Sequence, residues 1–274
     1  MKEKNKSLAT SFTQSLTRIW GVVMRHMYLY IRSLDRLSDS VYWPVMDIVV
    51  WGVTSRWMMQ NQTGIPDLVL MILTGLVFWQ IVWRANYEIS VNLLEEFWNQ
   101  NLVNLFSTPL TVYEWILSVM ILGFIKMILT AGVGIIAVWL LYSLNIFTVG
   151  WMIIPFAALL LLSGWFMGFL GAAFIMYYGN KVQTLAWTMG FMFAPFSAVY
   201  YPLSSLPNWI QNISKFLPTT YVFEGMRSII NDQGLPLDML LKSLGLNILY
   251  LTLAISFFVF MFEKSRGKGL ARLE

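Results

Sequence analysis

The chain has 274 residues, of which 58% are hydrophobic and only 12% are charged, and its formal net charge is +4. This composition excludes an ordinary soluble domain and indicates an integral membrane protein, because several apolar runs reach the roughly 20 residues that a helix needs to cross a bilayer. With no cysteine and a single histidine, His26, the chain offers no disulfide, no thiolate metal site and little histidine-based acid–base chemistry.

The amino-terminal segment, residues 1–38, is expected to form a cytoplasmic interface helix, and it shows no apolar core that would indicate a cleaved leader. Over residues 8–36, apolar side chains recur at three- and four-residue steps, at Leu16, Trp20, Val23, Met27, Tyr30 and Leu34. On the roughly opposite side lies a row of Arg18, Arg25 and Arg32. Such a helix is expected to lie on membrane lipids with its arginines near anionic headgroups. Whether it also contacts a cytoplasmic partner stays open.

Residues 39–274 are predicted to form an all-α membrane domain with six transmembrane helices. The predicted spans cover about 41–59, 66–87, 112–142, 150–178, 182–200 and 240–262. Pro155 and Pro195 are expected to kink or end helices locally. Lysine and arginine gather at both ends of the chain and at Lys181, whereas the loops at 61–64 and 143–147 contain none. Both termini are therefore expected to be cytoplasmic, and the loop at 201–239 external.

The cytoplasmic segment between the second and third spans is unusual because residues 90–115 contain no lysine or arginine. A helical stripe of Val91, Leu94, Trp98, Leu102 and Leu105 is predicted, with Glu95, Glu96 and three amide residues on the other side, and with Pro109 ending the helix. A helix on anionic lipid would favour basic residues, so an acidic one favours docking on a protein. A simple connecting turn is the alternative.

Charges at membrane depth are further candidates for function, and Asp47 and Lys126 are the clearest. Lys126 is expected to pair with a carboxylate such as Asp47, to face a water-filled cavity, or to extend its ammonium group to the interface. Pairing is the favoured interpretation. A proton relay needs a chain of titratable groups, which the sequence does not provide.

No catalytic or metal-binding motif is present: the chain lacks a G-x-x-x-x-G-K-[ST] phosphate loop, an H-E-x-x-H pair and a G-x-S-x-G elbow. No catalytic residue, metal site or cofactor is therefore expected in this chain. Any energy from ATP would have to come through a partner.

The external stretch from Tyr201 to Arg227 is too polar and too broken by prolines to span a membrane. It is predicted to form two short re-entrant helices, one starting at Pro207 and one after Pro218, with Thr219 or Thr220 as the second cap. Glu224 and Arg227 can pair on one face of the second helix.

These features resemble the membrane subunits of type 2 ABC exporters, and the resemblance covers most of the chain. The external signature "YP…LP…W…LP…Y…E…R" is met by Pro202, Pro207, Trp209, Pro218, Tyr221, Glu224 and Arg227, and the cytoplasmic segment carries Thr108-Pro109-Leu110 and Glu114. The resemblance implies a coupling helix to the ATPase that includes Glu95, Glu96, Trp98, Leu102, Leu105 and Phe106. It also implies that the amino-terminal helix contacts the ATPase.

The resemblance further implies a plasma (inner) membrane protein that works as a dimer, a homodimer or alternatively a heterodimer, with two cytoplasmic ABC ATPase subunits. Those partners would hold ATP and Mg, and no nucleic acid is involved. The translocation path would run along spans two and five, past Phe78, Trp79, Trp83, Trp187, Met189, Phe191 and Phe193. Their adaptable apolar surfaces suit an amphipathic or lipid-like cargo, such as a drug, a lipid or a lipid-linked glycan.

Two functions of other classes remain as alternatives. One is a self-sufficient carrier or channel, in which Lys126 or Asp47 would control coupling to a proton gradient. The other is a membrane transferase that uses Glu224, Arg227 or Asp232 as chemical groups.

Overall fold

A computed structural model describes residues 2–61, 68–231 and 234–270 and shows ten α-helices in those ranges. The helices are α1 (Lys2–Arg32), α2 (Leu34–Asn61), α3 (Leu68–Trp98), α4 (Leu102–Ser107), α5 (Val112–Tyr142), α6 (Ile153–Tyr178), α7 (Leu185–Phe193), α8 (Asn208–Ser214), α9 (Pro218–Ile230) and α10 (Leu237–Gly267). Short 3-10 segments lie at η1 (Ile146–Met152), η2 (Gly179–Val182), η3 (Ala194–Phe196) and η4 (Leu203–Ser205). The predicted start of span two at Pro66, and Asp232, lie outside the described residues.

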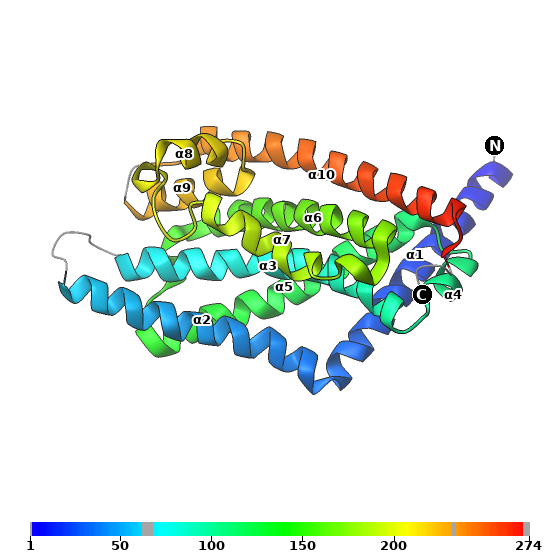
Figure 1. Cartoon of the computed structure of the whole chain (residues 1–274), viewed down its shortest axis with the longest axis horizontal. Helices are drawn as coiled ribbons and strands as arrows, with labels where there is room; N and C mark the ends of the chain where they lie inside the picture. The colour runs from blue at the N-terminus through cyan, green and yellow to red at the C-terminus, as the bar shows by residue number, and fades with distance from the viewer. Residues whose placement is uncertain (1, 62–67, 232–233, 271–274) are drawn as a thin grey trace.

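The long helices α2, α3, α5, α6 and α10 run side by side, and α1 crosses one end of them obliquely (Figure 1). The last turns of α10 and the short α4 lie at that same end, here called the α1 end. Helices α8 and α9 lie at the opposite end, here called the α8–α9 end. Helix α3 is the centre of the bundle, because 83% of its most apolar window is buried, against 17% for α10.

Close contact between α3 and α6 depends on small residues. A Cβ atom added at Gly164 would lie 2.5 Å from the Cβ of Ala85 and 2.6 Å from the carbonyl oxygen of Val82. At Gly168 it would lie 3.0 Å from the carbonyl oxygen of Asn86. Small residues at such positions let two membrane helices approach closely and gain van der Waals contact.

In the part of the chain that the structure describes, four helices are long and apolar enough to cross a membrane: Val69–Trp98, Val112–Tyr142, Gly150–Val182 and Leu237–Gly267. They correspond to the predicted spans two, three, four and six, and each helix of spans two and six extends beyond the predicted bounds. Span three matches α5 because Thr111 and Glu114 form a capping box at its start and Ser143 ends it with a left-handed backbone. Helix α2 contains the predicted first span but is less apolar, so the count of six spans stays a prediction.

The predicted fifth span over 182–200 is not one continuous α-helix. Its only α-helix, α7, has nine residues, and the apolar helical run that includes η3 ends at Phe196. Pro195 begins the tighter η3 turn, and Ala198 then takes a left-handed backbone with φ of 54°. The apolar helical stretch is therefore shorter than the predicted span, and its interruption lies at the proline where a kink was expected.

Three other sequence predictions are corrected. The amino-terminal helix does not continue to residue 36, because the Ser33 hydroxyl accepts a hydrogen bond from the backbone N–H of Arg36 and so caps α2. The predicted helix over the cytoplasmic segment is broken at Gln100, whose φ is 50°, so it divides into the end of α3 and α4. Thr219 and Thr220 lie inside α9 rather than capping it, since Pro218 is already its first residue.

The contact between α3 and α6 predicts opposite outcomes for two glycine substitutions. Gly164→Ala is expected to lower the free energy of unfolding by about 1–3 kcal/mol, because the backbone of α3 would have to move away. Gly132→Ala in α5 is the matched control, since an added Cβ there meets nothing within 4 Å. The control should be neutral or stabilising, as alanine favours helix by about 1 kcal/mol over glycine. Denaturant unfolding in mild detergent measures both, and equal stability of the two variants would contradict the packing.

Candidate functional site

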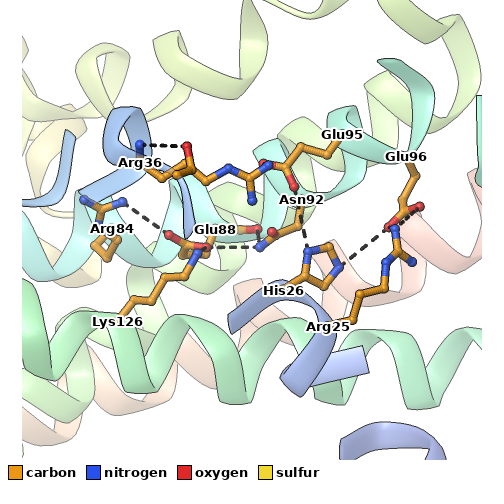
Figure 2. Close-up of polar contacts among 10 residues, drawn as sticks. Arg25, His26, Arg36, Arg84, Glu88, Asn92, Glu95, Glu96 and Lys126 are labelled. Carbon is orange, nitrogen blue, oxygen red and sulfur yellow. Dashed lines mark hydrogen bonds and ion pairs between the residues drawn. The ribbon is translucent and has the colours of Figure 1, made fainter. Parts of the chain in front are cut away.

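The last four turns of α3 carry a row of polar and charged residues inside the protein. Arg84, Glu88, Asn92, Glu95 and Glu96 are each at most 7% exposed. A buried charge is stable only when it is paired and hydrogen-bonded. The partners come from α1, α2 and α5, which converge on this part of α3 (Figure 2).

Glu88 lies at the centre of the first group of contacts. Its Oε2 accepts from the Lys126 ammonium of α5 at 2.6 Å and from the Asn92 amide at 3.1 Å, while its Oε1 accepts from Arg84 at 3.2 Å. Arg84 also donates to the Ser40 hydroxyl of α2 at 2.8 Å and lies 3.5 Å from Asp39. These contacts join α2, α3 and α5 around one carboxylate.

Glu95 and Glu96 form the second group, at the end of α3. Arg36 of α2 approaches Glu95 at 2.7 Å, and Arg25 of α1 approaches Glu96 at 2.7 Å. The Glu96 carboxylate also accepts from the Asn101 amide at 2.7 Å. His26 lies between the two carboxylates, with Nδ1 3.8 Å from Glu95 and Nε2 3.6 Å from Glu96.

We refer to Arg25, His26, Arg36, Asp39, Arg84, Glu88, Asn92, Glu95, Glu96 and Lys126 as the charge cluster. Its four cations and four carboxylates balance when His26 is neutral. The buried positions of these groups, and the different helices that supply them, make the cluster a connection among α1, α2, α3 and α5 rather than a reactive centre. Within the described ranges, no group of three His, Cys, Asp or Glu residues could hold a metal ion.

A separate ion pair fixes the first half of α1 to the start of α5. Arg18 donates to both oxygens of Glu114, with Nε–O distances of 3.1 and 3.0 Å, and the Ser15 hydroxyl donates to the same carboxylate at 2.6 Å. The hydrogen bond to Glu114 raises the pKa of Arg18. Two of the three arginines predicted to face lipid headgroups, Arg18 and Arg25, therefore point to carboxylates of this chain instead. That prediction is wrong for them because buried carboxylates need counter-charges.

The predicted partner of Lys126 is also corrected. Asp47 accepts a hydrogen bond from the Gln80 amide at 3.0 Å, while Lys126 pairs with Glu88. Glu88 and Arg84 were not among the predicted site residues. Their signal in the sequence is an arginine and a glutamate four residues apart in an otherwise apolar run, the spacing of an ion pair on one helix face.

The six residues predicted for a coupling helix occupy two different environments. Glu95, Glu96, Leu102 and Leu105 are buried. Phe106 is half-buried and packs on Phe262 of α10 with ring centroids 4.6 Å apart. Only Trp98 is exposed, at 47%. The outer surface here is instead formed by Trp98, Asn99, Gln100, Asn104, Ser107, Thr108 and Pro109, which we call the α4 surface.

Trp98 connects the α4 surface to α7. Its indole N–H donates to the Gln183 side chain at 3.2 Å, and its ring stacks with Trp187 of α7 at a centroid distance of 6.2 Å and an interplanar angle of 17°. The segment that leads into α7 is thus held against the end of α3.

The seven residues predicted for a translocation path do not share one surface in the single chain. Phe78 and Trp79 are buried in the core, where they pack on Phe156 and Phe223. Trp83 lies against Phe191, with centroids 4.5 Å apart, and Phe191 is 63% exposed. The remaining members are distributed along α7: Trp187 beside Trp98, Met189 in the core, and Phe193 against Phe166.

At the α8–α9 end, Glu224 and Arg227 form a clamp on the preceding loop. Arg227 is 7% exposed and donates to Glu224 at 2.9 Å and to the carbonyl oxygens of Ala198 and Val199. Glu224 also accepts from the backbone N–H of Leu203 at 3.0 Å. Burial lowers the pKa of Arg227, and Glu224 opposes that effect. The pair therefore holds the backbone of the loop between η3 and η4 in place. The sequence alone gave no sign of this role.

The rest of the predicted external signature lies around this clamp. Pro202, Pro207 and Pro218 stand at the starts of η4, α8 and α9. The Tyr221 hydroxyl donates to the carbonyl of Lys215 at 2.8 Å, which ties α9 to the end of α8. Trp209 is 62% exposed.

The buried and exposed lysine pairs allow a matched test of the charge cluster. Lys126→Met is expected to lower the free energy of unfolding by about 3–5 kcal/mol, because it leaves a buried carboxylate without one of its counter-charges. Lys242→Met removes a lysine that pairs with Asp238 at 2.7 Å in an exposed position, and should cost at most about 1 kcal/mol. Unfolding in detergent measures both variants. Equal losses would show that Lys126 is not held in a buried pair.

The clamp predicts a local change on loss of Arg227. Arg227→Gln is expected to speed hydrogen exchange at the backbone amide of Leu203 at least several-fold, because Glu224 would no longer be held in place to accept from it. Arg266→Gln removes an exposed arginine with the same three-residue spacing to a glutamate and is the control. Unchanged exchange at Leu203 in Arg227→Gln would contradict the clamp.

Comparison with known proteins gives one family match. The family model described as ABC-2 type transporter matches residues 17–231, which include the charge cluster, the α4 surface and the clamp. A search among curated proteins finds no match to the chain.

Proposed function

The chain belongs to the ABC-2 type transporter family, and on that basis we propose that it is the membrane-spanning subunit of an ATP-driven exporter. Members of this family are multi-pass transmembrane components, and the long apolar helices of this chain agree with that topology. Such components generally carry no catalytic activity. ATP hydrolysis would take place in separate ABC ATPase subunits, which would hold the ATP and Mg. With two such subunits, two copies of this chain would form the translocation path.

The α4 surface is the proposed docking site for the ATPase. It lies at the α1 end, beyond the last turn of α3, and its side chains are exposed whereas Glu95 and Glu96 are covered by α1 and α2. In this proposal, Glu95 and Glu96 hold the end of α3 in place through their ion pairs. The exposed amide, hydroxyl and indole groups of the α4 surface make the contact with the ATPase. Helix α1, tied to α3 and α5 by Arg25 and Arg18, would move with that segment.

The connection from Trp98 to Gln183 and Trp187 is the single observation that best supports a transport mechanism. It links the proposed docking site directly to the entrance of α7. A displacement of the α4 surface would therefore be passed to α7, where the exposed Phe191 and Met192 offer an apolar face to a second copy or to cargo. Packed helices transmit such shifts because their contacts are close and discrete.

The direction of transport and the cargo follow from the same proposal. Both termini would be cytoplasmic in the plasma (inner) membrane, with the α8–α9 end outside, as the distribution of lysine and arginine predicts. The aromatic and methionine side chains of α3 and α7 would suit an amphipathic or lipid-like molecule that leaves the cytoplasm.

Two serines provide a matched test of the docking surface. Ser107 and Ser205 are both exposed and both donate to a nearby backbone carbonyl, at 2.7 Å, but they lie at opposite ends of the molecule. Ser107→Trp is expected to reduce the amount of ATPase that co-purifies with the chain in mild detergent by several-fold, because a bulky ring would separate the two surfaces. Ser205→Trp should leave it at the wild-type level.

The identity of the co-purifying protein is read by mass spectrometry. A soluble partner with a phosphate-binding loop supports the exporter. If no such partner accompanies the wild-type chain from its native membrane, with and without nucleotide, the proposal fails and a self-sufficient carrier replaces it. If Ser107→Trp retains the partner fully, the docking site lies elsewhere.

A further inference from the structure

An apolar cavity of about 730 Å³ lies beneath α8. Helix α6 contributes Phe166 to its lining, α7 contributes Phe193, the turn after α8 contributes Phe216, and α10 contributes Tyr250 and Phe257. The hydroxyl of Tyr250 already donates to the carbonyl of Phe216 at 2.9 Å, so it offers little to a ligand. A space of this size lined almost entirely by hydrocarbon and aromatic rings does not hold ordered water well, because water needs two to four polar partners.

The mouth of the cavity faces the surroundings of the bundle. Phe216 and Leu253 line it and are 66% and 58% exposed. Helix α10 is the least buried of the four apolar helices, and α8 lies over it near the α8–α9 end (Figure 1). Because the outside of an apolar membrane helix is hydrocarbon, an acyl chain is the occupant that can enter this mouth without losing hydrogen bonds to water.

Polar groups for a headgroup lie at the same mouth, on α8. Asn212 lines the cavity and is exposed, and Lys215, the C-cap residue of α8, follows it by three residues, so the two lie on the same side of the last helical turn. Trp209 on the same helix is exposed at 62%, and an exposed tryptophan of this kind prefers the level of lipid headgroups.

Lys215 differs from the other cations near it. Arg227 is paired with Glu224, and Lys242 is paired with Asp238. Among the side chains that the structure describes, in residues 12–60, 69–147, 150–231 and 234–270, no carboxylate lies within ion-pair distance of Lys215. Its ammonium is therefore available to an anion that comes from outside this part of the chain.

We propose that the cavity binds a phospholipid of the surrounding bilayer that has an anionic headgroup, with its acyl chain between α7 and α10 and its phosphate at Asn212 and Lys215. The bound lipid would hold α8 against α10. The site is separate from the α4 surface and goes beyond the proposed function, because it requires a bilayer but no ATPase.

The test uses the full chain, purified with its associated proteins and placed in nanodiscs. The probes are phosphatidylglycerol and phosphatidylcholine that carry the same photoactivatable group near the end of one acyl chain. After irradiation, mass spectrometry locates the adducts. In the wild-type chain, we expect adducts from phosphatidylglycerol to concentrate on peptides that contain Phe216 or Leu253, several-fold above those on the exposed face of α5 around Ile136.

Two variants fill the cavity at different depths. Leu170→Trp acts at the half-buried α6 side of the lining, and Leu253→Trp acts at the exposed rim and so places little demand on folding. Both are expected to reduce the adducts at α8 and α10 several-fold while labelling around Ile136 is unchanged. Wild-type labelling no higher than at Ile136 would overturn the proposal, as would full labelling in the rim variant. A second copy of the chain that covers the mouth would give the first of these outcomes.

The headgroup preference is tested by charge. Lys215→Gln should remove the excess of phosphatidylglycerol adducts over phosphatidylcholine adducts, whereas Lys242→Gln, at a nearby but paired lysine, should retain it. Equal labelling by both lipids in the wild-type chain would overturn the anionic headgroup. Loss of ATPase co-purification without loss of lipid labelling would count against the proposed function alone.

Discussion

A carboxylate among apolar helices must be neutralised where it lies, and α3 carries three that are at most 7% exposed. Glu88 is met from α5, Glu95 from α2 and Glu96 from α1. Charge pairing, in addition to apolar packing, therefore determines which helices lie against α3. Since breaking a buried pair costs far more than breaking an exposed one, these contacts keep α1 on the bundle at one position and in one orientation.

At the two ends of the molecule, cationic side chains are paired with different kinds of acceptor. At the α1 end, cations meet carboxylates from other helices. At the α8–α9 end, Arg227 meets two backbone carbonyls of a loop in which Ala198 has a left-handed conformation. The loop also lies close to α3, because a Cβ at Gly75 would be 2.8 Å from the carbonyl oxygen of Val199. The ion pairs at the α1 end therefore hold helices together, whereas Arg227 at the α8–α9 end holds an irregular stretch of backbone.

The sequence predicted the long apolar helices and the two short ones after Pro202 because their length, periodicity and prolines are local signals. It could not predict that Lys126 selects Glu88 over Asp47, since that choice depends on how α5 and α3 are rotated in the bundle. The arginines of α1 were misread for a related reason: a helical period shows which residues share a face but not what that face meets. The interruption of the fifth span at Pro195 was expected from the proline itself, whereas the left-handed backbone at Ala198 has no signal in the hydropathy.

The ion pair between Arg84 and Glu88 has a consequence for the insertion of α3 into the membrane during synthesis. During synthesis α3 leaves the ribosome before α5, so Glu88 has to enter the membrane when Lys126 does not yet exist. Arg84, four residues earlier on the same helix and 3.2 Å from the carboxylate, provides a counter-charge that arrives together with it. The Arg84–Glu88 pair thereby enters the membrane as a neutral unit, and Lys126 later places α5 against the same carboxylate.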